Sequence, residues 1–290
     1  MIVAASSSPV GPARAARRAA VGVGLRPAHY RELAEIEVGP DYLEIITENF
    51  LGPAPAPRRH LARLAARYPI VLHGVSLNLL GHEPLDEAYL DQVARLADDV
   101  DAAFVSDHLC WTGAHGVSYH DLLPTPHTEA LVDLAATRAA YVQRRLGRRF
   151  ALENLSSYVS FAASTMDEAT FYRRVVDAAG CGFMLDVNNV YVSSQNHGFD
   201  PLAYLAAIDL GRVAQVHLAG HTRQPDGLII DTHDQPICDA VWALYAAAWR
   251  RGGPFPTLIE WDARIPPLAV VMAEAARARA VHGAAVEAAP

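Results

Sequence analysis

The chain has 290 residues, a formal charge of −8 at pH 7 and 51% hydrophobic residues. This length fits one large α/β domain, and the apolar content is sufficient for a core that needs no disulfides or structural metals. The net negative charge and the lack of a basic run exclude a typical nucleic-acid partner. No run of about eighteen apolar residues occurs, so we expect no membrane span.

The cysteines indicate a reducing compartment. Cys110, Cys181 and Cys238 lie in different apolar stretches, without the spacing of a disulfide framework or a CxxC motif. Because the apolar start of the chain is too short for a signal peptide, we expect a cytoplasmic protein. We expect a flexible N-terminal extension at 1–20, one domain at 21–283 and a flexible tail at 284–290.

Short apolar runs alternate with longer segments of helical period, which is typical of βαβ units. Eight such units predict a (β/α)8 TIM barrel, and a doubly wound open sheet is the alternative fold. The predicted strands are Val21–Leu25, Tyr42–Thr47, Ile70–Ser76, Phe104–His108, Phe150–Glu153, Gly182–Val187, Val213–Leu218 and Thr257–Trp261. The predicted helices are Arg58–Tyr68, Asp86–Val100, Thr128–Arg145, Asp167–Ala179, Ile237–Arg250 and Pro267–Ala280. Thr165, three residues before Glu168, predicts a capping box.

Side chains that bind metals follow nearly every predicted strand. Right-handed crossovers place the carboxyl ends of all the strands on one rim. Carboxylates gathered there would need compensating cations, because an unpaired buried carboxylate costs several kcal/mol. The residues at these strand ends include His73, Asp107, His108, Glu153, Asp186, Asn188, Asn189, His217 and Glu260.

Asp231-Thr232-His233 is the sharpest single signal. An extended backbone would point residues 231 and 233 to the same side and so present a carboxylate and an imidazole together. Mixed histidine and carboxylate ligands without thiolate suit iron, manganese or zinc. The residues therefore predict a metal centre at the carboxyl rim.

Seven short motifs follow one another along the chain: His73–Asn78, Ser106–Leu109, Glu153-Asn154, Leu185–Tyr191, Asn196–Asp200, His217–His221 and Asp231–Asp234. Together they resemble the motifs of the multinuclear non-heme iron-dependent oxidative enzymes, the family of MbnB/TglH-like peptide maturases. The resemblance covers about Val21 to Asp262. It implies a barrel related to the xylose isomerase and endonuclease IV group.

The resemblance implies two or three iron ions of mixed Fe(II)/Fe(III) state, with dioxygen as a co-substrate. Either Asn188 or Asn189 would be a ligand, and the sequence leaves that choice open. The implied ligands are His73, His108, Glu153, Asp186, Asn188 or Asn189, His217, Asp231, His233 and Glu260. Those expected to take part in catalysis are His73, His108, Glu153, Asp231 and His233.

The implied substrate is a cysteine, or another residue, of a ribosomally made precursor peptide. The resemblance also implies a small partner protein that captures the leader of that peptide. We expect the long segments Trp111–Pro126 and Val192–Asp200 to form walls of the substrate channel. Candidate substrate contacts are Tyr119, His120, Tyr158, Tyr191, His197 and His221.

Three other functions compete with this interpretation. A three-zinc hydrolase of the endonuclease IV type would need a basic groove, which the −8 charge disfavours. A sugar isomerase would need a lysine near its metals, and the sequence contains none. A non-catalytic metal-binding scaffold would bind iron but would consume no dioxygen.

Overall fold

The computed structural model describes residues 19–52 and 54–287. Most of the expected N-terminal extension, residues 1–18, and the last residues of the expected tail, 288–290, lie outside the described residues. Ala20 is buried, and the last helix runs to Glu287, beyond the start of the predicted tail.

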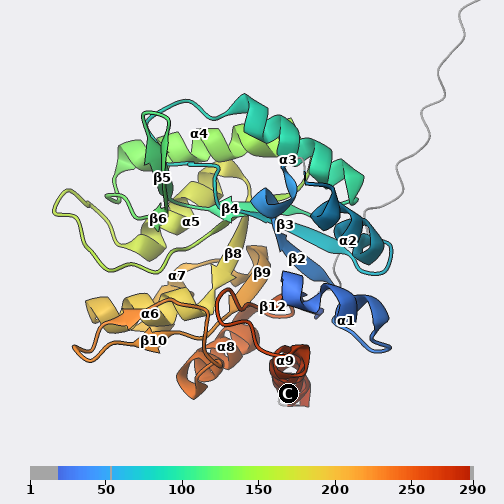
Figure 1. Cartoon of the computed structure of the whole chain (residues 1–290). Coiled ribbons are helices and arrows are strands. Elements are labelled where there is room, and N and C mark those ends of the chain that lie inside the picture. The colour runs from blue at the N-terminus through green and yellow to red at the C-terminus, as the bar shows by residue number, and fades with distance from the viewer. Residues whose placement is uncertain (1–18, 53, 288–290) are drawn as a thin grey trace, which may run out of the picture.

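In the described part of the chain, eight parallel strands form a closed barrel (Figure 1). Around the barrel the order is β1-β12-β9-β8-β7-β4-β3-β2, and pairing of β1 with β12 closes the circle. The predicted (β/α)8 barrel is confirmed, and the open sheet is excluded. The strands are β1 (Val21–Gly24), β2 (Leu43–Ile46), β3 (Ile70–Gly74), β4 (Val105–His108), β7 (Phe150–Glu153), β8 (Gly182–Asp186), β9 (Val213–Leu218) and β12 (Thr257–Ile259).

Helices cover the outside of the barrel and connect each strand to the next (Figure 1). Among the described residues, none of these helices has the length and apolar character needed to cross a membrane. The α-helices are α1 (Tyr30–Glu35), α2 (Pro55–Ala65), α3 (Glu87–Asp99), α4 (Glu129–Leu146), α5 (Glu168–Ala179), α6 (Val187–His197), α7 (Pro201–Ala207), α8 (Asp239–Gly252) and α9 (Leu268–Glu287). The 3₁₀ helices are η1 (Pro27–His29), η2 (Thr47–Phe50) and η3 (Leu210–Arg212).

Two connections on the carboxyl side also carry antiparallel hairpins. After β4, the hairpin of β5 (Trp111–Ala114) and β6 (Val117–Leu123) occupies most of the segment Trp111–Pro126, one of the two expected channel walls. After β9, the short strands β10 (Thr222–Arg223) and β11 (Ile229–Ile230) pair. Both hairpins therefore stand near the rim where the predicted site lies.

Most of the segment Val192–Asp200, the other expected channel wall, belongs to α6. That helix begins directly after β8. The Asp186 side chain accepts a hydrogen bond from the Asn189 backbone N–H at 2.6 Å and so caps the helix. Gly198 ends the helix in the left-handed conformation, with φ at 75°. Asp186 is thus both the last residue of a barrel strand and the cap of a helix.

The predicted capping box at Thr165 is wrong. The cap of α5 is Asp167, whose side chain accepts a hydrogen bond from the Thr170 backbone N–H at 2.7 Å. The Thr165 hydroxyl instead donates to the His127 carbonyl at 3.4 Å. A carboxylate nearer to the helix therefore takes the role that the sequence pattern assigned to threonine.

Side chains inside the barrel form two layers, because alternate residues of a strand face the same side. The lower layer is mostly apolar and contains Ala20, Tyr42, Val71, Phe104, Ala151, Met184, Ala214 and Leu258. Two residues farther toward the carboxyl end lies a polar layer of Glu44, His73, Ser106, Glu153, Asp186 and Glu260. The register between β8 and β9 shifts by one residue, so β9 adds Gln215 and His217 to the polar layer.

Candidate metal centre

The polar layer brings several carboxylates together in the buried interior of the barrel. Glu44, Glu153, Asp186 and Glu260 are each at most 7% exposed. The guanidinium of Arg26, which follows β1, lies 3.7 Å from Glu260. One guanidinium cannot balance four carboxylates, and each buried unpaired carboxylate costs several kcal/mol. The layer therefore calls for further cations.

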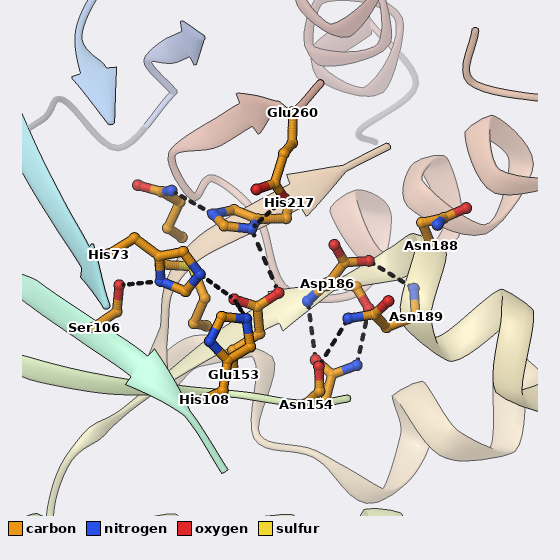
Figure 2. A network of polar contacts seen from close by, with 12 residues as sticks. His73, Ser106, His108, Glu153, Asn154, Asp186, Asn188, Asn189, His217 and Glu260 are labelled. Atoms are coloured by element: carbon orange, nitrogen blue, oxygen red, sulfur yellow. Dashed lines mark hydrogen bonds and ion pairs between the residues drawn. The ribbon is translucent and has the colours of Figure 1, made fainter. Parts of the chain in front are cut away.

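Three imidazoles surround the carboxylate of Glu153 (Figure 2). Its Oε2 lies 2.9 Å from His73 Nε2 and 3.4 Å from His108 Nε2, and its Oε1 lies 3.5 Å from His217 Nδ1. Despite these short distances, Glu153 Oε2 has no hydrogen-bond partner of acceptable geometry. Three ring nitrogens thus converge on one carboxylate, as the ligands of a shared ion do.

Hydrogen bonds on the far side of two rings hold them in this orientation. His108 Nδ1 lies 3.0 Å from the Gly74 carbonyl, which can only accept a hydrogen bond, so Nδ1 carries the proton. The Nε2 lone pair of neutral His108 then faces Glu153. His73 Nδ1 contacts the Ser106 hydroxyl at 2.9 Å, which likewise leaves Nε2 directed inward. Metal-binding histidines are usually held in this way.

A second set of ligands lies across the barrel mouth. Glu260 Oε2 is 3.1 Å from His217 Nδ1 and 3.5 Å from His233 Nδ1. His233 Nε2 lies 2.7 Å from Asp231 Oδ1. Asp186 Oδ2, also buried, has no hydrogen-bond partner. This side of the centre therefore offers imidazole and carboxylate atoms like those around Glu153.

These side chains form four overlapping groups whose ligand atoms lie within 4.8 Å of one another. Ligands that each lie about 2.0–2.2 Å from one ion are at most about 4.4 Å apart, so the spacing is close to that of real sites. The groups are His73 with His108 and Glu153; Glu44 with His217 and Glu260; Glu153 with Asp186 and His217; and Asp186 with His233 and Glu260. The first and last groups share no residue, so the arrangement has room for more than one ion.

The charges in the layer act strongly on one another. Burial favours the neutral acid, but the imidazoles, led by His217, outweigh it and hold the pKa of Glu153 well below its usual value. Burial, and then the negative charges of Asp231 and Glu153, raises the pKa of Asp186 well above its usual value. Burial lowers the pKa of His73, but Glu153 outweighs this effect and raises it to about 9. The protonation of each carboxylate in the layer therefore depends on the imidazoles and carboxylates next to it.

The residues fit a metal centre. Buried polar atoms without a hydrogen-bond partner are costly, and five of those in and beside this layer belong to expected metal ligands. Bound ions would satisfy these atoms and neutralise the carboxylates. The five are Glu153 Oε2, Asp186 Oδ2, Asn189 Oδ1, His217 Nδ1 and His233 Nε2.

A cavity of about 310 Å³ lies over this centre and is open to solvent. It gives a ligand direct access to the imidazoles and carboxylates. Its walls include His73, His108, Asp121, Leu122, Glu153, Leu155, Ser156, Tyr158, Asn189, Asp231, His233, Glu260 and Asp262.

Comparison with known proteins identifies the family. The model of the RiPP precursor modification enzymes MbnB/TglH/ChrH, which act on ribosomally made peptides, matches residues 20–283. The chain belongs to this family. It is similar to a UPF0276 protein of Anaeromyxobacter sp., with 47% identity over 268 residues that cover 92% of this chain and 94% of that protein. A UPF0276 protein of Rhizorhabdus wittichii is 48% identical over 264 residues, which cover 90% and 94%.

Solved structures show the same fold at low sequence identity. A D-psicose 3-epimerase from Clostridium cellulolyticum superposes with a TM-score of 0.60 at 11% identity, covering 90% of this chain and 97% of that one. Endonuclease IV from Thermus thermophilus gives 0.55 at 18% identity, covering 93% and 100%. These likenesses place the RiPP precursor modification enzyme among xylose isomerase-like and endonuclease IV barrels, and they show the fold alone.

The structure of this family member separates the two asparagines that the sequence left as alternatives. Asn188 uses both ends of its amide: Nδ2 donates to Asp231 Oδ1 at 2.6 Å, and Oδ1 lies 2.8 Å from His221 Nδ1. Asn189 donates through Nδ2 to the Asn154 carbonyl at 3.0 Å (Figure 2), but its Oδ1 has no partner, and the residue lines the cavity. The free oxygen thus belongs to Asn189.

Asp231 and His233 meet as predicted, but not through an extended backbone. His233 has a φ of 46°, in the left-handed region. Its carbonyl accepts hydrogen bonds from the backbone of Asp262 at 2.8 Å and of Ala263 at 3.4 Å. These contacts with the segment after β12 stabilise the uncommon conformation, so the tertiary structure turns the imidazole toward the carboxylate.

The six candidate substrate contacts lie in different places. Tyr158 lines the cavity, and its hydroxyl accepts a hydrogen bond from the Asp231 backbone N–H at 3.0 Å. Tyr119 and His120 are exposed on β6 and do not line that cavity. Tyr191 and His221 stack with ring centroids 5.2 Å apart, behind Asn188.

The sixth candidate, His197, lies outside the metal cavity. Its Nε2 is 2.8 Å from the Ser157 hydroxyl and 3.0 Å from the Ser157 carbonyl. It lines a second cavity beside the centre.

Sequence reasoning missed Glu44 and Arg26. Glu44 lies 3.1 Å from His217 Nε2 and belongs to one of the four groups. It lies in the middle of an otherwise uncharged strand, two residues after Tyr42. A single charged residue inside a barrel strand is the sequence feature that could have identified it as a site residue. Arg26 forms ion pairs with Asp262 and Glu260, which only the closure of the barrel brings together.

Proposed function

We propose that this protein holds two or three iron ions and uses dioxygen to oxidise a cysteine, or another residue, of a ribosomally made precursor peptide. Membership of the RiPP precursor modification family supports the peptide substrate. The observation that carries the metal proposal is the convergence of buried, unpartnered oxygen and nitrogen atoms in and beside one polar layer. The donor set of imidazole, carboxylate and amide, without thiolate, suits iron.

The geometry suggests which residues would hold each ion. His73, His108 and Glu153 would hold one ion, and Asp186, His233 and Glu260 would hold another. Between them, His217 with Glu153 and Asp186 would hold a third. Asn189 Oδ1 and Asp231 are available to complete a coordination shell next to the cavity.

When bound, iron would pass electrons from the substrate residue to dioxygen, so that the residue is oxidised as dioxygen is reduced, and it would offer a binding site for the thiolate of a substrate cysteine. The protein's own residues orient the ligands and shape the approach. Ser106 and the Gly74 carbonyl hold the rings of His73 and His108. Leu155 and Leu122 form apolar parts of the cavity wall, and Tyr158 fixes the loop of Asp231 through its backbone N–H.

The leader of the peptide would be captured by a separate small partner protein, acting in the cytoplasm with this chain. The cavity over the metal centre is about 310 Å³, which suits one or two side chains rather than a folded leader segment. Recognition of the remaining peptide therefore falls to surfaces outside the cavity.

Co-expression with a candidate peptide tests the proposal. The protein would be produced with a short cysteine-containing peptide and a leader-binding protein encoded beside it, purified without oxygen, and analysed for metals. We expect two or three irons per chain, and a mass change of the peptide that requires oxygen. Glu153→Gln is the matched variant, because it keeps the shape of the side chain and removes the charge shared by two ligand groups.

Two results would contradict the proposal. Anaerobically purified protein that contains one zinc and no iron would remove the iron assignment. Iron-loaded protein that leaves every co-expressed neighbouring peptide unchanged in air would favour a non-catalytic scaffold.

A further inference from the structure

A second cavity lies directly beside the metal cavity. It has a volume of about 260 Å³ and lies among the loop after β7, the start of α5, the segment before α4 and the end of α6. Leu155 lines both cavities. The next residues alternate between them, since Ser156 and Tyr158 face the metal cavity whereas Ser157 and Val159 face the second one. A wall one residue thick thus separates the two spaces.

The second cavity is apolar on most sides. Two of its apolar residues are strongly accessible to solvent, with Val159 at 55% and Phe161 at 36% exposure. Apolar surface gathered around a hollow is typical of a binding site. The apolar residues of the wall are Leu109, Pro124, Leu155, Val159, Phe161, Met166 and Phe171.

One polar atom in this wall lacks a partner. Thr125 is 8% exposed, and its hydroxyl oxygen makes no hydrogen bond. A buried hydroxyl without a partner costs about 1–3 kcal/mol, so a ligand that offers a backbone carbonyl or amide would gain from it. Thr125 therefore points to a ligand that carries a polar group next to an apolar one, as every peptide residue does.

We propose that this second cavity binds a large apolar or aromatic side chain of the precursor peptide, a few residues from the residue that is modified. The inference rests on the proposed function, because the shared wall at Leu155 connects the cavity to the metal centre. The volume is below the about 300–1,000 Å³ of pockets that enclose whole small molecules, which favours a single side chain. Occupancy of this cavity would set the register of the peptide over the metals.

Binding of indole, a free aromatic side-chain analogue, tests the cavity without any peptide. The full chain as purified would be titrated with indole by ligand-detected NMR, in parallel with methylguanidine as a cationic probe. We expect indole to bind with a Kd on the order of 1 mM and methylguanidine not to bind.

Two variants of the same loop make the test specific. Ser160 lines the cavity, so Ser160→Phe would place a ring inside it and weaken indole binding at least about tenfold. Ala163 is exposed on the same loop and does not line the cavity, so Ala163→Phe serves as the matched control and should leave the Kd unchanged. Metal content should be equal in both variants, which separates this result from any failure of the iron proposal.

Several outcomes would overturn the inference. These are absence of indole binding, equal binding by Ser160→Phe, and preferential binding of methylguanidine, which would indicate a cationic side chain instead. With a processed peptide in hand, alanine replacement of its large apolar residues near the modified one should raise KM about tenfold and change kcat little. If indole binds but no such replacement alters KM, the cavity serves a ligand other than the peptide.

Discussion

His233 Nδ1 and Asp262 Oδ2 lie 2.9 Å apart, so a carboxylate from the segment after β12 holds a ring from the loop after β11. Asp262 is in turn held by Arg26, whose Nε also donates to the Trp261 carbonyl at 2.9 Å. The chain from Arg26 through Asp262 to His233 leaves Nε2 of the ring facing Asp231 and the cavity. Such outer partners typically contribute a factor of about 10–100 in metal affinity.

Asp262→Asn should therefore weaken iron binding about 10- to 100-fold without unfolding the protein. The amide cannot hold His233 with the same charge or donor pattern. Iron retained after dialysis against a graded series of chelator concentrations would measure the effect. Asp234→Asn is the control, because Asp234 is bound by Thr222 and Thr232 rather than by a histidine. Equal iron retention in Asp262→Asn and the native protein would remove this role.

Asn189→Ala should lower the iron content, whereas Asn188→Ala should largely preserve it. Asn189 lines the cavity and its Oδ1 has no partner, whereas the amide of Asn188 is already used by Asp231 and His221. We expect about a tenfold loss of affinity at one site in the first variant. Elemental analysis of both proteins after the same dialysis decides between them. The reverse order of iron loss would assign the ligand to Asn188.

Glu168 should make stability depend on pH. Burial is the main reason that its pKa is raised to about 7 from an ordinary 4.5, while the Tyr204 hydroxyl lowers it and Asp167 raises it further. The folded protein therefore binds a proton that the unfolded chain releases between these values. The stabilisation is complete below about pH 4.5 and is lost as the pH rises toward 7.

Glu168→Gln should remove that part of the pH dependence. We expect the unfolding free energy of Glu168→Gln, relative to that of the native protein, to change by on the order of 1–3 kcal/mol between about pH 5 and pH 8. This figure is discounted because the Glu168 side chain is partly exposed. Urea unfolding at several pH values would measure it. Glu129→Gln, at the same first position of helix α4, provides the control. A constant difference across this range would contradict the assignment.

Two buried tyrosines should respond in opposite directions to the loss of their hydroxyls. Tyr42 is fully buried in the lower layer, and its hydroxyl has no hydrogen-bond partner. The Tyr172 hydroxyl lies 2.6 Å from the Leu152 carbonyl and 2.7 Å from the Met184 carbonyl, to which it donates. Tyr42→Phe should raise the unfolding free energy by about 1 kcal/mol, and Tyr172→Phe should lower it by about 1–3 kcal/mol. Denaturant unfolding of both variants checks the signs.

The sequence by itself determined the eight barrel strands, six of the helices and most of the residues at the barrel mouth. Short apolar runs bounded by helical segments fix a strand through local properties alone, and β7 and β9 begin and end at the predicted residues. His73, His108 and Glu153 could be found because a barrel gathers strand ends at one rim.

Only the tertiary structure decided the contacts between segments that are far apart in the chain. The choice between Asn188 and Asn189 depends on where α6 starts, and so on the capping by Asp186. The left-handed turn at His233 depends on hydrogen bonds from the segment after β12. Arg26 reaches Asp262 only because β1 pairs with β12 and closes the barrel. The local sequence determines secondary-structure propensity and hydrophobic periodicity. The energy of these contacts instead comes from partners that only the closed barrel brings together.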